Sequence, residues 1–101
     1  MKLSLYTYVR NGLHLDFHVV QMLKHHVPLA DEIIVNEGYS TDGTYEAITS
    51  IDPKIQVFRT NWDAPTHYRW YGERKDPARR RCTGDWCLFL DSDEFIPEWQ
   101  F

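Results

Sequence analysis

The chain has 101 residues, a length that allows one domain at most. Hydrophobic residues make up 43% of it and aromatic residues 15%, which is typical of a folded globular domain and excludes a disordered chain. The formal net charge of −4 argues against a protein dedicated to nucleic-acid binding. We see neither a signal peptide nor an apolar run of roughly 20 residues that could span a membrane, and we expect a cytoplasmic protein.

The first half of the chain alternates predicted strands and helices. Residues 2–9 alternate in polarity and favour a strand. Residues 13–26 predict a helix that ends before a proline, with an apolar side formed by Val19, Val20, Leu23 and Val27. A short apolar strand follows over residues 31–36. The next helix is expected to start near Asp42, whose carboxylate can cap it, and to run to about residue 50.

The second half begins with a predicted strand at residues 55–59. Residues 60–75 form an irregular stretch rich in aromatic side chains, which is either a functional loop or a set of rings packed on the core. Asp76 and Pro77 predict a helix start, with the helix over residues 78–83 and Gly84 as its C-terminal cap. The continuous apolar run at 86–90 predicts a strand buried on both faces.

Histidines and cysteines give no strong metal signal. His14 and His18 have the i, i+4 spacing of metal ligands but no companion glutamate or third ligand, so we prefer a solvated helix face that they share with His25. Cys82 and Cys87 are five residues apart and fit no common zinc pattern. We expect Cys87 to act as a small buried hydrophobic residue, and free thiols suit a reducing compartment.

The order of these elements predicts an α/β fold with a mainly parallel sheet of about four strands flanked by helices. Ligands of such sheets bind at the carboxyl ends of the strands, where residues 7–11, 37–42 and 91–94 should meet. Asp91 and Asp93 are two positions apart in an extended segment, so their carboxylates can point the same way. Such oxygen ligands suit Mg²⁺ or Mn²⁺, and an acidic turn without a ligand is the alternative.

A cation at this edge would neutralise a diphosphate and stabilise it as a leaving group. Arg79, or a neighbouring arginine, is a candidate for a charge-assisted hydrogen bond to phosphate. Glu37 or Asn36 could accept a hydrogen bond from a nucleobase. A nucleoside diphosphate as leaving group is what the chemistry of activated sugars requires.

Two stretches resemble one enzyme family. Residues 30–44, which contain the run Ser-Thr-Asp-Gly-Thr, resemble the second-strand signature of family 2 glycosyltransferases with the GT-A fold. Residues 78–79 followed by 83–94 resemble that family's arginine-bearing helix and Asp-x-Asp motif. The sequence at 61–63, Asn-Trp-Asp, is similar to the branch of lipopolysaccharide-core sugar transferases. The resemblance covers nearly the whole chain.

The resemblance implies a Rossmann-like GT-A half-domain that takes a nucleoside-diphosphate sugar as donor. It implies a divalent metal, Mn²⁺ or Mg²⁺, held by Asp93 and Asp91, and inverting transfer to a carbohydrate or lipid-linked acceptor. The nucleotide-sugar contacts that it implies are Thr7, Tyr8, Glu37, Arg79, Asp91 and Ser92.

The chain also departs from the family pattern. Asn36 stands where an aspartate is common and Tyr39 lengthens the loop by one residue, so the identity of the nucleotide stays open. The acceptor-binding half of the family follows the Asp-x-Asp motif, and no residue matches its general base. We therefore interpret residues 1–101 as the donor-binding half of a truncated domain. Its last strand should leave an exposed sheet edge, from which we expect self-association or reduced stability.

Two other functions remain as alternatives. A phosphotransferase with an Asp-x-Asp nucleophile is disfavoured, because in that pattern the motif follows the first strand and here it follows the fourth. A non-enzymatic nucleotide-binding module fits the same residues. The basic cluster at 69–81 reads as a solvated face, with an acidic acceptor or an anionic membrane surface, hence a peripheral position at the inner membrane face, as the alternative.

Overall fold

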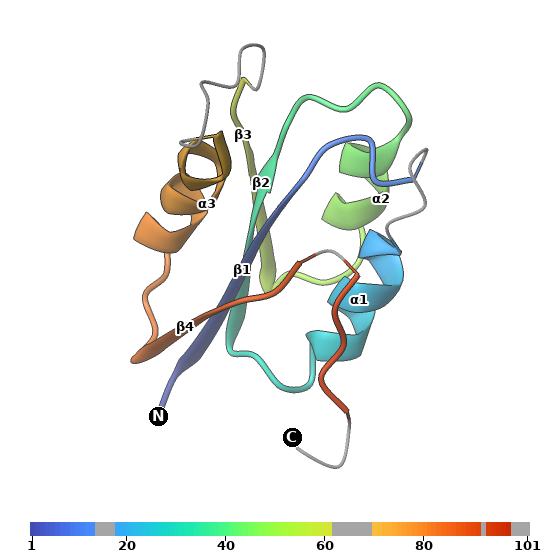
Figure 1. The fold of residues 1–101 in the computed structure, drawn as a ribbon. Helices are drawn as coiled ribbons and strands as arrows, with labels where there is room; N and C mark the ends of the chain where they lie inside the picture. Colours follow the sequence, from blue (N-terminus) through green and yellow to red (C-terminus); the bar gives the residue numbers. More distant parts are fainter. Residues whose placement is uncertain (14–17, 62–69, 92, 98–101) are drawn as a thin grey trace.

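The structure is a computed structural model and describes residues 1–13, 18–61, 70–91 and 93–97. Four strands pair in parallel in the order β3-β2-β1-β4, which confirms the predicted α/β class (Figure 1). The strands are β1 (Leu3–Val9), β2 (Glu32–Glu37), β3 (Ile55–Arg59) and β4 (Trp86–Phe89). Since all four run the same way, their carboxyl ends share one edge of the sheet.

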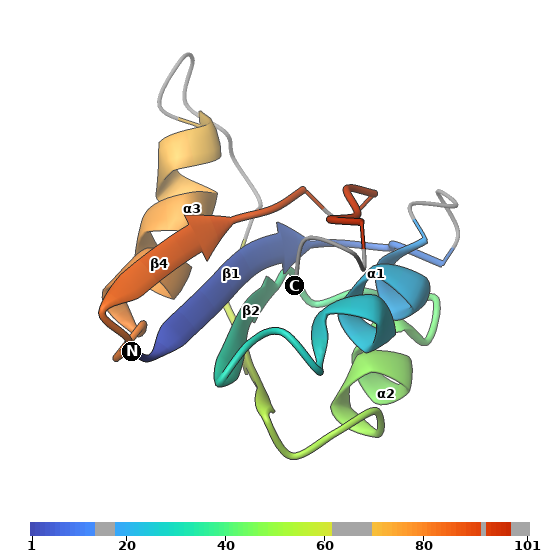
Figure 2. The ribbon, with the colours of Figure 1, turned by 90° about the horizontal axis from the view of Figure 1, so that it is seen from below.

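The helices formed by the described residues connect the strands and cover both faces of the sheet. They are α1 (Val19–His26), α2 (Thr44–Thr49) and α3 (Trp70–Arg80). Figures 1 and 2 show α1 and α2 on one face and α3 on the other. Among the described residues, no helix combines the length and the apolar character needed to cross a lipid bilayer.

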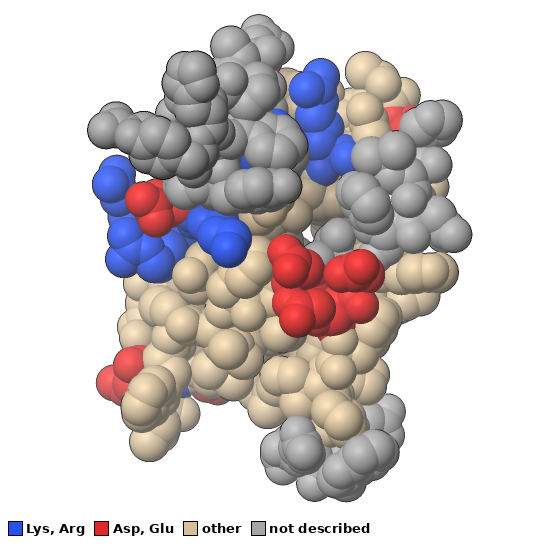
Figure 3. Space-filling model, in the orientation of Figure 1, with Lys and Arg blue, Asp and Glu red and all other residues tan. Residues whose placement is uncertain are grey.

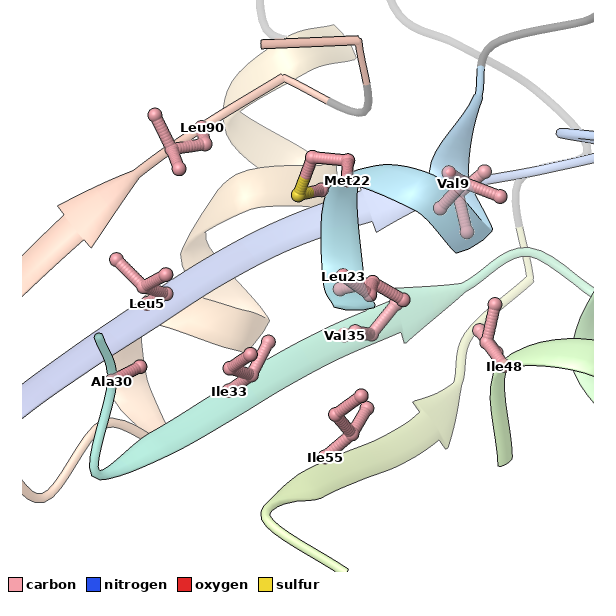
Figure 4. Close-up of a cluster of buried hydrophobic side chains, with 11 residues drawn as sticks. Leu5, Val9, Met22, Leu23, Ala30, Ile33, Val35, Ile48, Ile55 and Leu90 are labelled. Carbon is pink, nitrogen blue, oxygen red and sulfur yellow. The ribbon is translucent and has the colours of Figure 1, made fainter. Parts of the chain in front are cut away.

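The main core lies between the sheet and the helices α1 and α2. Figure 4 shows Leu5 from β1 and Ile33 from β2 among the apolar side chains of this cluster, with Met22 and Leu23 entering from α1. Val19 and Leu23 are buried as the helical pattern predicts, whereas the predicted Val20 and Val27 are only partly buried and pack at its margin.

The start of α1 differs from the prediction. The helix begins at Val19, whereas the apolar pattern predicts a start at Leu13, which the structure places in a turn. His18, just before the helix, has a φ of 55° in the left-handed region, and a right-handed helix cannot continue through that conformation. His14, the other member of the predicted i, i+4 pair, lies outside the described residues.

The prediction for α3 was wrong at its start. The helix begins at Trp70, inside the stretch expected to be irregular, and Pro77 lies within it instead of at its first position. A proline inside a helix removes one backbone donor, and the helix tolerates this loss here. Gly84 does not cap α3, which ends at Arg80. Residues 62–69 of the aromatic stretch lie outside the described part of the chain.

The strand β4 is an edge strand, so the prediction that it is buried on both faces was wrong. Trp86 is 62% exposed and Cys87 is exposed as well, so this cysteine does not serve as a buried hydrophobic residue. An unbroken apolar run does not distinguish a central strand from an edge strand, because that depends on where the chain crosses over. The expectation of an exposed sheet edge is confirmed, and self-association through it stays a prediction.

A buried carboxylate at the end of the sheet where the strands begin fixes the position at which β4 starts. Glu32 accepts hydrogen bonds from Ser4 Oγ (2.5 Å) and from Thr83 N (2.6 Å) and Oγ1 (2.9 Å). The next residue, Gly84, donates its amide to Ser4 Oγ (2.8 Å), and a Cβ at Gly84 would lie 2.7 Å from the Lys2 carbonyl oxygen. Only glycine allows β4 to begin this close to β1.

We predict that Glu32→Gln lowers the free energy of unfolding by about 2 kcal/mol at neutral pH, because an amide nitrogen then faces buried donors. Burial raises the pKa of Glu32, but the hydrogen bonds from Ser4 and Thr83 outweigh burial and leave it below the usual value. The stabilisation is therefore complete above about pH 4.3 and is lost as the pH falls through the folded-state pKa.

Urea unfolding of the wild type and of Glu32→Gln across this pH range measures the difference between them. Glu46→Gln, which changes an exposed glutamate in the first turn of α2, is the control and should stay within about 0.5 kcal/mol of the wild type. A wild-type advantage over Glu32→Gln that persists undiminished in acid would contradict the assignment.

Candidate functional site

The loops that follow β1 and β2 are joined at the carboxyl edge of the sheet. The Gly38 amide donates to the Val9 carbonyl oxygen (2.9 Å). Asn11 donates its amide to Ser40 Oγ (2.7 Å), and its Oδ1 accepts from the Thr41 amide (2.9 Å). Two of the three predicted segments are therefore joined, and the third follows β4, which pairs with β1.

The acidic segment continues β4 past its last ladder residue. Leu90 donates its amide to the Tyr6 carbonyl oxygen (3.3 Å), which keeps the chain beside β1. The chain then turns, with the Asp91 amide bound to Glu94 Oε1 (2.7 Å) and the Glu94 amide bound to the Asp91 carbonyl oxygen (3.0 Å). Figure 3 shows acidic side chains gathered in one cluster on this face. We call Asp91, Asp93 and Glu94 the acidic turn; the predicted contact Ser92 lies outside the described residues.

The acidic turn carries unbalanced negative charge. Partial burial raises the pKa of Asp91, and the carboxylates of Glu94 and Asp93 raise it further. The ammonium group of Lys75 acts in the opposite direction and lowers this pKa, but it does not outweigh the other causes. A cation placed against the turn would relieve the repulsion, and this property is expected of a metal site before the metal binds.

Lys75 and Tyr8 border the acidic turn from the α3 face of the sheet. The Lys75 ammonium lies 4.1 Å from the centre of the Phe89 ring, and the Tyr8 ring stacks on the same ring with centres 5.9 Å apart. Arg79, the predicted phosphate contact, lies one turn further along α3 and pairs with Asp76 through its Nε (3.3 Å). The structure thus places Lys75 close enough to Asp91 for its positive charge to lower the pKa of Asp91. A phosphate contact by Arg79 stays a prediction.

Glu37 is fully buried beneath the loop that follows β2. Its Oε1 accepts hydrogen bonds from the Tyr39 amide (3.0 Å) and from Arg59 Nε (2.8 Å), and its Oε2 accepts from the Ser40 amide (2.9 Å). The neighbouring Asn36 is buried too and donates from Nδ2 to the Arg74 carbonyl oxygen (2.9 Å). In this structure Glu37 organises the loop, and its predicted contact with a nucleobase stays a prediction.

Tyr39 stands out of the same loop as an exposed ring. Its φ is 56°, an uncommon conformation for an aromatic residue, and 53% of its surface is exposed. The Arg59 guanidinium lies 4.9 Å from the centre of the Tyr39 ring and 3.9 Å from that of Tyr45. The arginine that neutralises Glu37 therefore also supports an aromatic surface at the carboxyl edge of the sheet.

Thr7 lies below the surface on the α1 face of β1. Only 2% of it is exposed, and its buried Oγ1 has no hydrogen-bond partner among the described residues. It lines a cavity of about 10 Å³ with Met22, Leu23 and Leu90, near the lower size limit for one water molecule. Direct contact between Thr7 and a nucleotide therefore stays a prediction.

The acidic turn fits a divalent cation only with help from a ligand. Among the described residues, no group of three or more His, Cys, Asp and Glu side chains is arranged to hold a metal ion by itself. Mg²⁺ commonly binds through one or two carboxylates together with substrate phosphates, and Asp91 with Asp93 supplies that number. The residues present therefore fit a cation that arrives with a diphosphate.

Sequence comparison identifies the family of the chain. A family model described as glycosyl transferase family 2 matches residues 19–99. The chain belongs to glycosyl transferase family 2. This confirms the resemblance to that family, while the role of the Asp-x-Asp stretch stays a prediction. A comparison with curated proteins gives no match.

Structure comparison agrees with the family assignment. The S. aureus TarS 1–349 crystal structure superposes with a TM-score of 0.72 at 25% identity, covering 99% of this chain and 30% of TarS 1–349. The complex of TarS 1–349 with UDP-GlcNAc superposes with a TM-score of 0.70 at 25% identity, covering 99% of this chain and 29% of the other. A TarS complex with UDP also matches, at 25% identity with a TM-score of 0.70 over 97% of this chain and 29% of that one. This chain therefore spans about 30% of the length of these TarS proteins.

Sequence reasoning overlooked Lys75 and Tyr39 as members of this site. Lys75 is one of six basic residues between positions 69 and 81, and only the helix phase of α3 shows which of them faces Phe89. The sequence shows Tyr39 as one extra residue in the loop after β2. That signal predicts an altered loop, but it does not predict that the ring is exposed.

We predict opposite shifts of the Asp91 pKa in two variants. Glu94→Gln removes a negative charge but keeps an oxygen for the Asp91 amide, so the pKa should fall toward its usual value. Lys75→Met removes the positive charge, so the pKa should rise further. Carbon-detected NMR titration of the Asp91 carboxyl group measures both. Shifts of the same sign in the two variants would be incompatible with the charge arrangement described above.

Proposed function

We propose that this chain binds a nucleoside-diphosphate sugar at the carboxyl edge of its sheet and forms the donor half of a metal-dependent, inverting glycosyltransferase. The observation that carries the proposal is the acidic turn at the end of β4 in a chain of glycosyl transferase family 2. Further support comes from TarS, since the same fold was solved there in complex with UDP-GlcNAc. The proposed acceptor is a carbohydrate or lipid-linked hydroxyl.

Asp91 and Asp93 would hold the divalent cation, Mn²⁺ or Mg²⁺. When bound, the cation supplies charge neutralisation for the diphosphate leaving group. The chain's own contribution is to keep two carboxylates at the tip of β4, where repulsion from Glu94 already favours a cation. Lys75 adds a second positive charge on the α3 side of the turn, within reach of the same field.

The Tyr39 ring would provide a stacking surface for the nucleobase. The ring is exposed, while Arg59 and the buried Glu37 hold the loop beneath it. Stacking of a base on an aromatic side chain contributes about 1–3 kcal/mol and selects weakly among bases. Selection of one base then depends on polar groups around the ring. We assign this role to Glu37 or to the loop that it holds.

A nucleotide-binding module without turnover is the second candidate. It follows from the sequence resemblance, which assigns no residue of this chain to the general base that inverting transfer requires. Both candidates bind a nucleoside diphosphate, and only release of the sugar from a nucleotide sugar to an acceptor separates them. A turnover assay with UDP-GlcNAc, chosen because TarS was solved with it, is the direct test.

We predict that the chain binds UDP in a Mn²⁺-dependent manner. Asp93→Asn should weaken the binding at least tenfold, about 1.4 kcal/mol, because a cation ligand loses its charge. Asp85→Asn makes the same chemical change at the amino end of β4 and is the matched control. Calorimetry with and without EDTA provides the measurement. UDP binding that is unaffected by EDTA and by Asp93→Asn would refute the metal-dependent part of the proposal.

We predict that Tyr39→Ala weakens UDP binding by about tenfold, whereas Tyr39→Phe stays within about twofold of the wild type. The reason is that stacking needs the ring but not the hydroxyl group. Titration with UDP and with inorganic diphosphate, both with Mn²⁺, separates the base from the phosphates. The loss in Tyr39→Ala should appear with UDP alone, and an equal loss with diphosphate would show that the loop, not the stacking, has changed.

A further inference from the structure

The segment that leaves the acidic turn is held against α1 by two adjacent histidines. Figure 1 shows this segment running beside α1. The Ile96 amide donates to His26 Nε2 (3.1 Å), and the Ile96 carbonyl oxygen accepts from His25 Nε2 (2.5 Å). Both backbone polar groups of one residue are thus bound by side chains that lie 70 and 71 positions earlier in the chain.

Ring contacts reinforce this attachment. The Phe95 ring meets the His25 ring edge-on with centres 5.4 Å apart and stacks over the His26 ring at 6.2 Å. His26 is fully buried, and its Nδ1 donates to the Met22 carbonyl oxygen (2.8 Å). The proton on Nδ1 leaves Nε2 as an acceptor, which is the form that the Ile96 amide requires. We call the contacts of His25 and His26 with Phe95 and Ile96 the histidine anchor.

The histidine anchor fixes the chain on the C-terminal side of the acidic turn. On the upstream side, the hydrogen bond from Leu90 to Tyr6 keeps the chain on β1. The described residues between these two attachments are Asp91, Asp93 and Glu94. A turn fixed at both ends loses little conformational freedom when a ligand binds, and that saving appears as affinity.

We propose that His25 and His26 are positioning residues for the acidic turn, which raise its affinity for a metal-bound nucleoside diphosphate by holding Ile96. This inference rests on the proposed function, because it assigns residues that prepare the same site. Neither histidine needs to touch the ligand. The prediction is that releasing Ile96 weakens the binding of UDP with Mn²⁺ by about tenfold, the equivalent of ordering roughly one backbone residue.

Protonation supplies a readout that a purely structural role would not give. A proton on His26 Nε2 would face the Ile96 N–H and break the hydrogen bond. Burial lowers the pKa of His26, the hydrogen bond to the Met22 carbonyl oxygen offsets part of this, and the neighbouring His25 lowers the pKa further, so the anchor is intact at neutral pH. The segment packed against the ring brings Phe95, Ile96 and Pro97, none of which is charged. The anchor should therefore weaken as the pH falls from about 6.5, the ordinary pKa of a histidine, through the lowered pKa of His26.

The test uses three variants of the 101-residue chain. His26→Leu removes both the acceptor for the Ile96 amide and the group that takes up a proton. His26→Gln keeps an acceptor near the position of Nε2 but has no titratable group. Phe95→Ala removes the exposed ring. Lys24→Gln, an exposed change in the same turn of α1, is the matched control. Hydrogen exchange of the Phe95 and Ile96 amides reports the anchor, and calorimetry with UDP and Mn²⁺ reports the site, each between about pH 5 and pH 8.

We expect faster exchange and about tenfold weaker UDP binding in His26→Leu and Phe95→Ala, with His26→Gln within about threefold of the wild type and less sensitive to acid. If His26→Leu does not fold, Phe95→Ala decides the question. Wild-type affinity in variants whose 95–96 amides exchange faster would overturn this inference alone. Absence of UDP binding to the wild type would overturn the proposed function and the inference with it.

Discussion

The carboxyl edge of the sheet depends on the buried carboxylate of Glu37. A fully buried charge is costly unless it is paired and hydrogen-bonded, and Glu37 meets that condition with two loop amides and Arg59. The same arginine supports the ring of Tyr39, so the loop geometry and the exposed aromatic surface share one charge pair. Loss of the pair would leave a buried ion without a partner and release the loop that borders the proposed nucleotide site.

The acidic turn is built in the opposite way. Its carboxylates face outward, their repulsion is only partly balanced by Lys75, and the turn is kept in place from both sides by backbone contacts. A group of charges that repel one another stays ordered only if other contacts hold the chain. In this protein those contacts are the pairing of Leu90 with β1 upstream and the histidine anchor downstream.

The predictions from sequence succeeded where local pattern is decisive. The strand at residues 55–59 was placed correctly, and α2 begins two residues after Asp42, whose carboxylate binds the Thr44 amide although Gly43 is the N-cap residue. They failed where the outcome depends on distant partners. The pair Asp76-Pro77 is typical of a helix start, but α3 extends back to Trp70. His25 was expected in solvent and is half-buried, because a segment more than 70 residues away packs against it.

The sequence by itself determined the α/β class, the family and the placement of two aspartates at the end of a strand. These follow from hydrophobic periodicity and from short motifs, which are properties of neighbouring residues. The tertiary structure alone decided the strand order β3-β2-β1-β4, the position of Lys75 near Asp91, and the attachment of Ile96 to α1. Strand order, helix phase and long-range hydrogen bonds depend on how crossovers bring distant segments together, and local pattern carries no record of them.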